Sequence, residues 1–274
     1  MKYALLLLLL SAGLPAQENR LTPTEKRDGW ILLFDGRTFN GWRDPARYNV
    51  PGDGWSIQDG VLRSKPKPWV RDDLLSEQSF DNFDLKFDFK LMPGANSGLK
   101  YRIQHVLFLD PKKLTPGPNG FEGQIGREIA DPKSDRAQLA RDSHAEDYTI
   151  AFEFQLLDDE KHPDARFGSD RQTGALYRML PPSEKASKPV GEWNSARLVV
   201  RGSQVEHWLN GVKVVDGRLD DPRVLQGIRE RWAPAPAVRM MLLRPMQNGP
   251  FALQHHGDEV WFRNIKVKRL NPGE

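Results

Sequence analysis

The densest group of reactive side chains lies near the end of the chain, between two apolar segments. Positions 255–259 hold two histidines, a glycine and two acids, preceded by Leu253 and followed by Val260. A tight turn needs the glycine, but it needs neither imidazoles nor carboxylates, so the group is typical of a site at a strand end. Such side chains could transfer protons as general acid and general base. A solvated polar hairpin is the alternative interpretation.

A second candidate lies in a segment of strict alternation, residues 151–156. Its aromatic residues would face a core, whereas Glu153 and Gln155 would face the opposite side. A glutamate among aromatic neighbours is costly unless it faces water or a ligand, so Glu153 is a candidate for catalysis. Alternatively, Glu153 could form an ion pair with Lys100 or Arg102 on a neighbouring strand, which would explain its presence without a catalytic role.

Short strands must position these groups. Residues 83–91 alternate between apolar and charged side chains, and residues 99–104 place Leu99, Tyr101 and Ile103 on one face. Asp59-Gly60 and Asn210-Gly211 are dipeptides typical of two-residue hairpin turns. Further strands are expected at residues 30–34, 55–64, 174–179, 193–200, 205–215, 237–243, 251–253 and 260–267.

These strands are ten or more in number, and they leave room for at most one or two helices. We expect one helix near residues 134–141 and one within residues 219–232. Many short strands with turn signals at close spacing predict an all-β sandwich of two antiparallel sheets, of the jelly-roll kind.

The first 16 residues resemble a secretory signal. Lys2 precedes a short apolar run, and a small residue, Ala16, stands before the expected cleavage point. The run is too short to span a bilayer, and no second apolar run follows it. We therefore expect an exported protein, periplasmic or extracellular, with no membrane contact after the signal is removed. Because there is no cysteine, disulfides, thiolate chemistry and a lipid anchor on cysteine are excluded.

The remaining chain predicts one large domain. A polar lead-in at residues 17–28 precedes a single domain at residues 29–270, with an insertion at about residues 107–148 that could be a lid or a passive decoration. The 40 basic and 37 acidic residues are interspersed, which gives no reason to expect a nucleic-acid partner. The eight tryptophans could bind sugars, but core filling accounts for most of them.

Motifs spread along the chain resemble those of the domain of unknown function 1080 family. In chain order they are Leu33-Phe34-Asp35-Gly36 with Gly41-Trp42, residues 55–62, Asn96-Ser97-Gly98, Glu153-Phe154-Gln155 with Leu157-Asp158, Gly174-Ala175-Leu176-Tyr177, Lys188-Pro189 with Trp193-Asn194, His207-Trp208-Leu209-Asn210-Gly211 and residues 253–264. Each motif is weak by itself, but together they run in order from about residue 29 to residue 270.

The resemblance implies a concanavalin-type jelly roll that acts on 3-keto-glycosides. The implied activities are 3-keto-glucoside-1,2-lyase and 3-keto-2-hydroxy-glucal hydratase, which together hydrolyse a 3-keto-disaccharide. One departure is clear: the family usually has Asp where this chain has His255, so a role that depends on that acid is in question here. The insertion at residues 107–148 also looks longer than usual.

The implied substrate defines the groups that the site needs. A ketone at C3 acidifies the C2 proton, which a general base removes, while an acid protonates the leaving oxygen at C1. A cation or a hydrogen-bond donor stabilises the enolate oxygen. Glu153 and His256 are the candidates for base and acid, in either order, and Lys100 or a metal could polarise the ketone.

Other side chains could bind the substrate or a cation. The candidates for sugar hydroxyls are Asn96, Gln155, Asp158, Tyr177 and Asp258. The candidates for a divalent cation are His255, His256, Asp258 and Glu153, although their spacing is not diagnostic.

Structural roles compete with each of these interpretations. Asp158 could be only a loop acid, His256 could cap its turn, and Lys100 could be solvated or ion-paired. His162 and His207 are interpreted as structural. For the whole protein, the rival functions are a non-catalytic carbohydrate-binding module and a secreted interaction domain, because a jelly roll hosts lectins as readily as enzymes.

Overall fold

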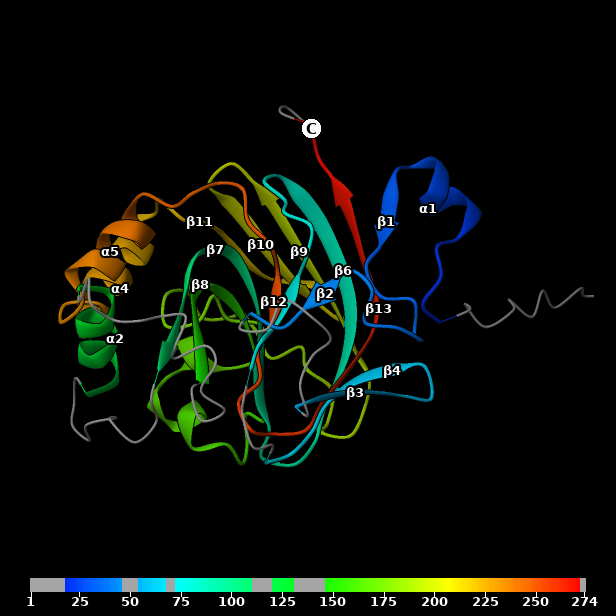
Figure 1. Cartoon of the computed structure of the whole chain (residues 1–274), viewed down its shortest axis with the longest axis horizontal. Coiled ribbons are helices and arrows are strands. Elements are labelled where there is room, and N and C mark those ends of the chain that lie inside the picture. Colours follow the sequence, from blue (N-terminus) through cyan, green and yellow to red (C-terminus); the bar gives the residue numbers. More distant parts are fainter. Residues whose placement is uncertain (1–17, 46–53, 68–71, 110–119, 131–145, 272–274) are drawn as a thin grey trace, which may run out of the picture.

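The computed structural model describes residues 18–45, 54–67, 72–109, 120–130 and 146–271. In this part of the chain two antiparallel sheets pack face to face, and short helices lie outside them (Figure 1). The signal expected at residues 1–16 and the helix expected near residues 134–141 lie outside the described residues. None of the described helices is both long and apolar enough to cross a membrane.

The larger sheet has eight strands, in the order β11-β10-β9-β6-β13-β4-β3, with β1 paired to β13. The bounds are β1 Trp30–Leu32, β3 Trp55–Gln58, β4 Val61–Ser64, β6 Phe83–Leu91, β9 Asn194–Arg201, β10 Gln204–Leu209, β11 Val212–Arg218 and β13 Val260–Arg269. Both predicted hairpin turns are present, since Asp59-Gly60 and Asn210-Gly211 have positive φ at all four residues, as a type I′ turn requires.

The smaller sheet has five strands, in the order β2-β5-β12-β7-β8. The bounds are β2 Trp42–Arg43, β5 Leu74–Ser76, β7 Asn96–Leu109, β8 Glu146–Leu157 and β12 Ala252–Leu253. All pairs in both sheets are antiparallel, so the predicted sandwich is confirmed.

Alternating apolar residues of the two sheets form the core between them. On β6 the residues from Phe83 to Leu91 at every second position are buried. Phe87 of β6 meets Phe154 of β8 edge to face, with ring centroids 6.0 Å apart. Phe152 is buried on the same side of β8, so Glu153 between them points to the opposite face of the smaller sheet, as the alternation predicted.

The alternation predicted for β7 fails after Tyr101. Arg102 has φ 49°, and the pairing register between β7 and β8 shifts between Tyr101 and His105. Such a bulge reverses the face of the residues that follow it. Ile103 therefore packs with Leu75 and Ala252 on the outer face of the smaller sheet, not with Tyr101 in the core.

Helices are more numerous than the sequence suggested. The α-helices are α1 Pro23–Arg27, α2 Gly120–Ala130, α4 Pro222–Arg231 and α5 Pro236–Leu243, and the 3-10 helices are η2 Pro163–Phe167 and η3 Ser169–Arg171. The strand expected at residues 237–243 is wrong, because Val238 and Leu242, one helical turn apart, are the buried residues of α5. The elements α2, α4 and α5 form one cluster beside β7 and β8 (Figure 1).

The strand expected at residues 174–179 is also wrong. Gly174 and Arg178 have φ of 92° and 57°, which breaks an extended run into turns. The segment nevertheless follows the edge of β8, where the backbone N–H of Tyr177 donates to the carbonyl oxygen of Glu153.

Replacing a core ring tests the importance of the packing between the sheets. Phe154→Ala should lower the free energy of unfolding by about 3 to 5 kcal/mol, since Phe154 is fully buried between Phe87 and His207. Phe167→Ala is the control, because Phe167 is 73% exposed and should change stability by less than about 0.5 kcal/mol. Urea unfolding followed by tryptophan fluorescence measures both, and equal effects would contradict this account of the core.

Candidate active site

A pocket of about 320 Å³ lies on the outer face of the smaller sheet, away from the sandwich core. The strands β7 and β8 contribute its polar floor, and α2 and α4 contribute side chains that cover it. Six of the eight residues predicted for the site line this pocket; they are Asn96, Lys100, Glu153, Gln155, Tyr177 and His256. Four adjoining segments of the fold therefore meet at one cavity.

Strand register brings the two central charges together. Lys100 of β7 and Glu153 of β8 are direct partners across the antiparallel ladder. Lys100 Nζ also donates to Asp73 Oδ2 at 2.7 Å, and both side chains of this ion pair are almost fully buried. Lys100 is therefore ion-paired, as one interpretation held, and it is also part of the pocket floor.

The buried charges change one another's ionisation. Burial opposes the charged form of Lys100, yet the carboxylates of Asp73 and Glu153 hold the pKa of Lys100 above its ordinary value. Burial raises the pKa of Glu153, although the neighbouring ammonium acts in the opposite direction. The site thus holds a permanent cation beside a carboxyl group that can gain or lose a proton.

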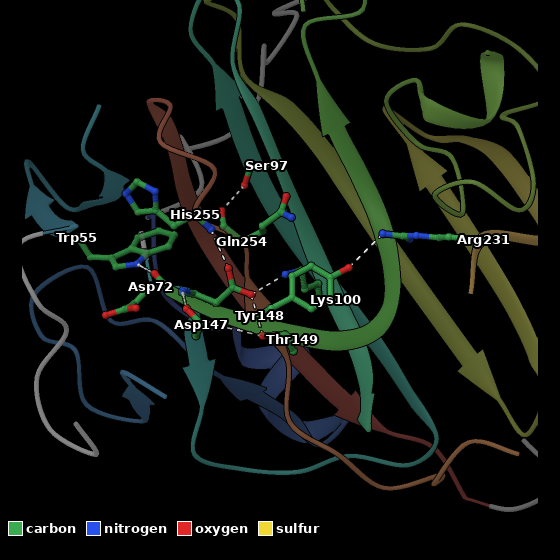
Figure 2. Close-up of polar contacts among 11 residues, drawn as sticks. Trp55, Asp72, Ser97, Lys100, Asp147, Tyr148, Thr149, Arg231, Gln254 and His255 are labelled. Carbon is green, nitrogen blue, oxygen red and sulfur yellow. Dashed lines mark hydrogen bonds and ion pairs between the residues drawn. The ribbon is translucent and has the colours of Figure 1, made fainter. Parts of the chain in front are cut away.

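Several pocket residues were missed by sequence reasoning. Asp73 and Asp147 lie at one end of the pocket, where Thr149 Oγ1 is 2.9 Å from Asp73 Oδ2. The same Oγ1 is 3.3 Å from Asp147 Oδ2 (Figure 2). Asp147 and Thr149 continue the alternation of Glu153 at positions i−6 and i−4, which is a signal that could have identified them. Asp73 comes from a segment before β5, and no local pattern marks it.

The opposite wall comes from the helices. Arg231, at the end of α4, donates to the Tyr148 hydroxyl at 3.1 Å (Figure 2). Its guanidinium also lies 3.6 Å from Glu122 of α2 and over the Tyr177 ring. Tyr177 in turn donates to Asp164 Oδ2 at 2.8 Å. These contacts connect the covering helices α2 and α4 to the pocket. No pattern in the sequence marked Arg231 as a pocket residue.

Two amide side chains present unused acceptors in this pocket. Among the described residues, Gln155 Oε1 and Gln254 Oε1 are buried and have no hydrogen-bond partner. A buried acceptor without a partner is costly, so such atoms are typical of positions that a ligand completes. Both would accept hydrogen bonds from hydroxyl groups, and the Gln155 amide lies 3.5 Å from Asn96 Oδ1.

His256 stands at the exposed side of the pocket. Its Nδ1 lies 3.9 Å from Asp258 Oδ2, and its ring is 5.9 Å from the ring of His162. The backbone N–H of Asn96 donates to Asp258 at 3.1 Å. Partial burial opposes the charge of Asp258, but these donors and the nearby imidazoles hold its pKa below the ordinary value. Asp258 itself lies beside the pocket and not in its lining.

A cation site fits these residues poorly. His255 does not join the others, because its Nδ1 accepts from Gly257 N and its Nε2 donates to Gly54 O. Within the described part of the chain, the group close enough to share an ion is His162, His256 and Asp258. The Nδ1 of His162 accepts from Asp164 N at 3.1 Å, so Nε2 carries the proton in the neutral ring. Binding of a cation by His162 would therefore require this hydrogen bond from Asp164 N to be lost.

The remaining candidates have structural roles. Asp158, predicted to bind hydroxyls, lies outside this pocket and accepts from the backbone N–H groups of Gly94, Glu160 and Lys161. It is the loop acid of the alternative interpretation. The structural role of His207 is confirmed: it is fully buried, donates to Gly174 O and contacts the Tyr101 hydroxyl, and burial lowers its pKa to about 4.

The tryptophans do not form an open platform on the described surface. Trp42, Trp55 and Trp232 are buried. On the outer face of the larger sheet, half-buried tryptophans lie beneath cations, for example Lys90 Nζ at 4.2 Å from the Trp261 ring and Arg263 Cζ at 4.0 Å from the Trp193 ring. These rings are therefore already in contact with cations of the protein itself.

The sequence comparisons identify the family. The model of the 3-keto-alpha-glucoside-1,2-lyase-like domain matches residues 29–268. The chain belongs to this family. A curated relative is the 3-keto-disaccharide hydrolase of Bacteroides thetaiotaomicron, 32% identical over 258 residues, which are 89% of this chain and 79% of that protein. The resemblance inferred from the motifs is therefore confirmed, and it supports a carbohydrate-active enzyme.

Solved structures agree on the fold. A candidate glycosyl hydrolase from Parabacteroides distasonis is 27% identical, with a TM-score of 0.67 over 93% of this chain and 100% of that chain. A second from the same organism is 23% identical, with a TM-score of 0.56 over 88% of this chain and 99% of that chain, and shows likeness of fold alone.

The position of Glu153 depends on a glycine beside it. A Cβ at Gly98 would lie 2.1 Å from Glu153 Oε1, so Gly98→Ala must turn the carboxyl group away from its place next to Lys100. With the acid–base role proposed for Glu153 in the next subsection, the rate should fall about a hundredfold. The same Cβ would lie 2.8 Å from Glu153 Cγ, so the whole side chain must turn, and urea unfolding measures what this change costs in stability. Gly123→Ala, whose Cβ would make only an ordinary contact, is the control. Full activity of Gly98→Ala would refute this placement.

Proposed function

We propose that this chain is an exported enzyme that cleaves 3-keto-glycosides by elimination across the C1–C2 bond, followed by addition of water. The observation that carries the proposal is the buried pair of Lys100 and Glu153 in the pocket floor. Elimination next to a ketone needs a cation for the enolate and a base for the proton, and this pair supplies both. Family membership and the curated relative support the same substrate class.

The first step is removal of the C2 proton. Glu153 accepts this proton as a carboxylate, and its raised pKa brings its basicity closer to neutral pH. The electrons move onto the C3 oxygen, where the Lys100 ammonium stabilises the negative charge. We assign this role to Lys100 and not to a divalent cation, since the imidazole group at the rim suits a cation poorly.

The second step breaks the bond between C1 and the leaving oxygen. His256 at the exposed side of the pocket donates a proton to this oxygen, and the Asp258 carboxylate lies 3.9 Å from its Nδ1. Water then adds to C1 of the enone and a proton returns to C2, by the same groups in reverse. This route needs no oxocarbenium ion and no fixed carboxylate pair.

The sugar would be held by neutral side chains. Its hydroxyl groups would donate to the unpaired acceptors of Gln155 and Gln254, with Asn96 adjacent. Tyr177 lines the same pocket from the segment along β8.

Comparing an oxidised and an unoxidised substrate tests the function. The protein should release the aglycone from a 3-keto-glucoside and leave the parent glucoside intact, because only the ketone acidifies C2–H. The assay follows free aglycone by chromatography. Equal cleavage of the parent would indicate an ordinary glycosidase. Glycan binding without turnover of either compound would favour the carbohydrate-binding module.

Replacing the proton-transfer groups tests their roles. Glu153→Gln and His256→Ala should each lower the rate by about two or more orders of magnitude. Glu153→Gln should still fold, because the amide keeps the shape and removes a buried ionisable group. His162→Ala is a matched control at the rim, on a ring that is not assigned to proton transfer. A normal rate for Glu153→Gln would remove this residue from the mechanism.

An isotope experiment distinguishes elimination from an oxocarbenium route. Elimination breaks the C2–H bond, so turnover in heavy water should place deuterium at C2 of the 3-keto product. An oxocarbenium route leaves C2 untouched. Free product also exchanges slowly next to its ketone, so product incubated alone in heavy water gives the background. Absence of C2 deuterium above this background, together with no kinetic isotope effect for a substrate deuterated at C2, would rule out elimination, because Glu153 could otherwise return the same proton to C2.

A further inference from the structure

One hydroxyl group at the end of the pocket lies between two carboxyl groups. Thr149 Oγ1 is within hydrogen-bond distance of both Asp73 Oδ2 and Asp147 Oδ2, at 2.9 Å and 3.3 Å. All three residues are buried. A threonine hydroxyl has one hydrogen and can donate to only one of the two. The second contact is a hydrogen bond only if the other carboxyl group carries a proton and donates it to Oγ1.

The partners of the two carboxyl groups identify which one carries that proton. Asp73 accepts from Lys100 Nζ at 2.7 Å and from the backbone N–H of His255 at 3.0 Å. Asp147 accepts from the backbone N–H of Asp73 at 2.6 Å, and no ammonium or guanidinium group is bonded to it among the described residues. The cation is thus on Asp73, and the neutral carboxylic acid belongs at Asp147.

The charges around Asp147 also favour its neutral, protonated form. The groups that face it are Asp72 and Asp73, from the segment before β5, and Lys100 on β7. Burial, together with the two neighbouring acids, raises the pKa of Asp147 well above its ordinary value, and the ammonium only partly opposes this. Burial also raises the pKa of Glu153 on the same strand, so an experiment on Asp147 has to distinguish the two groups.

We propose that Asp147 is a positioning residue that works as a protonated carboxylic acid. Asp147 donates to Thr149 Oγ1, Thr149 donates to Asp73, and Asp73 holds the Lys100 ammonium in the pocket. Loss of the proton would put two carboxylates on one hydroxyl, and one contact would have to break. The role in turnover rests on the proposed function of Lys100, whereas the protonation state can be tested without turnover.

Infrared difference spectroscopy tests the protonation state directly. At neutral pH the wild-type protein should show the carbonyl stretch of a protonated carboxyl group, and part of this band should be missing in Asp147→Asn. The same part should remain in Glu153→Gln, which separates Asp147 from the other raised group. A spectrum that Asp147→Asn leaves unchanged would overturn the proposal, because Asp147 would then be ionised.

Stability gives a second readout that does not depend on activity. A raised pKa in the folded state means that the unfolded chain releases this proton at lower pH. The stabilisation from this group is therefore largest below its unfolded pKa, of about 4, and declines as the pH rises through its folded pKa. When the free energy of unfolding in urea is measured across pH, Asp147→Asn should not show this part of the decline. An unchanged slope would contradict the proposal.

Kinetics test the positioning role. Asp147→Ala should lower kcat about tenfold, as loss of one hydrogen bond next to a charged group does, and Asp147→Asn should recover most of the loss because its amide still donates to Thr149. Thr149→Val should show the same loss, whereas Thr149→Ser should not. The alkaline limb of the pH profile should move to higher pH in Asp147→Asn. Equal losses for Asn and Ala would show that the carboxylate is required and would overturn the proposal.

The outcomes separate this inference from the proposed function. If the infrared band and the stability slope behave as expected but no 3-keto-glucoside is cleaved, the proposed function fails and the protonated state of Asp147 stands. If 3-keto-glucosides are cleaved and Thr149→Val acts like Thr149→Ser, the proposed function stands and the relay through Thr149 fails.

Discussion

The buried ammonium of Lys100 is the constraint on which the pocket depends. A charge removed from water costs several kcal/mol unless a partner of opposite sign is held against it. The partner is Asp73 at 2.7 Å, and Glu153 stands opposite on the neighbouring strand. These three charged groups meet only if β5, β7 and β8 keep their register. A change in the packing of the smaller sheet would therefore also change the polar groups on its outer face.

The two faces of the smaller sheet differ in composition and in role. The inner face carries rings such as Phe152 and Phe154, which fill the space between the sheets and make the strands rigid. The outer face carries acids and an amine, which would be unstable in a core and are stable here because they pair with one another, and amides whose acceptors are open to the pocket. The rigid inner face therefore fixes the spacing of the polar groups on the outer face, and catalysis benefits from such fixed geometry.

The cover of the pocket comes from parts of the chain that follow or interrupt the strands. Arg231 at the end of α4 meets Tyr148 of β8 and Glu122 of α2, so three distant segments close around one guanidinium. The helix α5 packs with both α2 and α4, which gives a physical reason why residues 237–243 are helical. Their apolar content is compatible with a strand or a helix, and the neighbouring helices decide between them.

The sequence alone determined the features that follow from local periodicity. Strict alternation in β6 and β8 predicted the sandwich and placed Glu153 opposite the buried rings, and the dipeptides Asp59-Gly60 and Asn210-Gly211 predicted their turns, because side-chain direction and φ are properties of adjacent residues. Tertiary structure decided the rest. The bulge at Arg102, the helix α5 and the meeting of Asp73, Asp147 and Arg231 depend on contacts between segments far apart in the chain. No local pattern encodes those contacts, since their energy exists only once the sheets have packed.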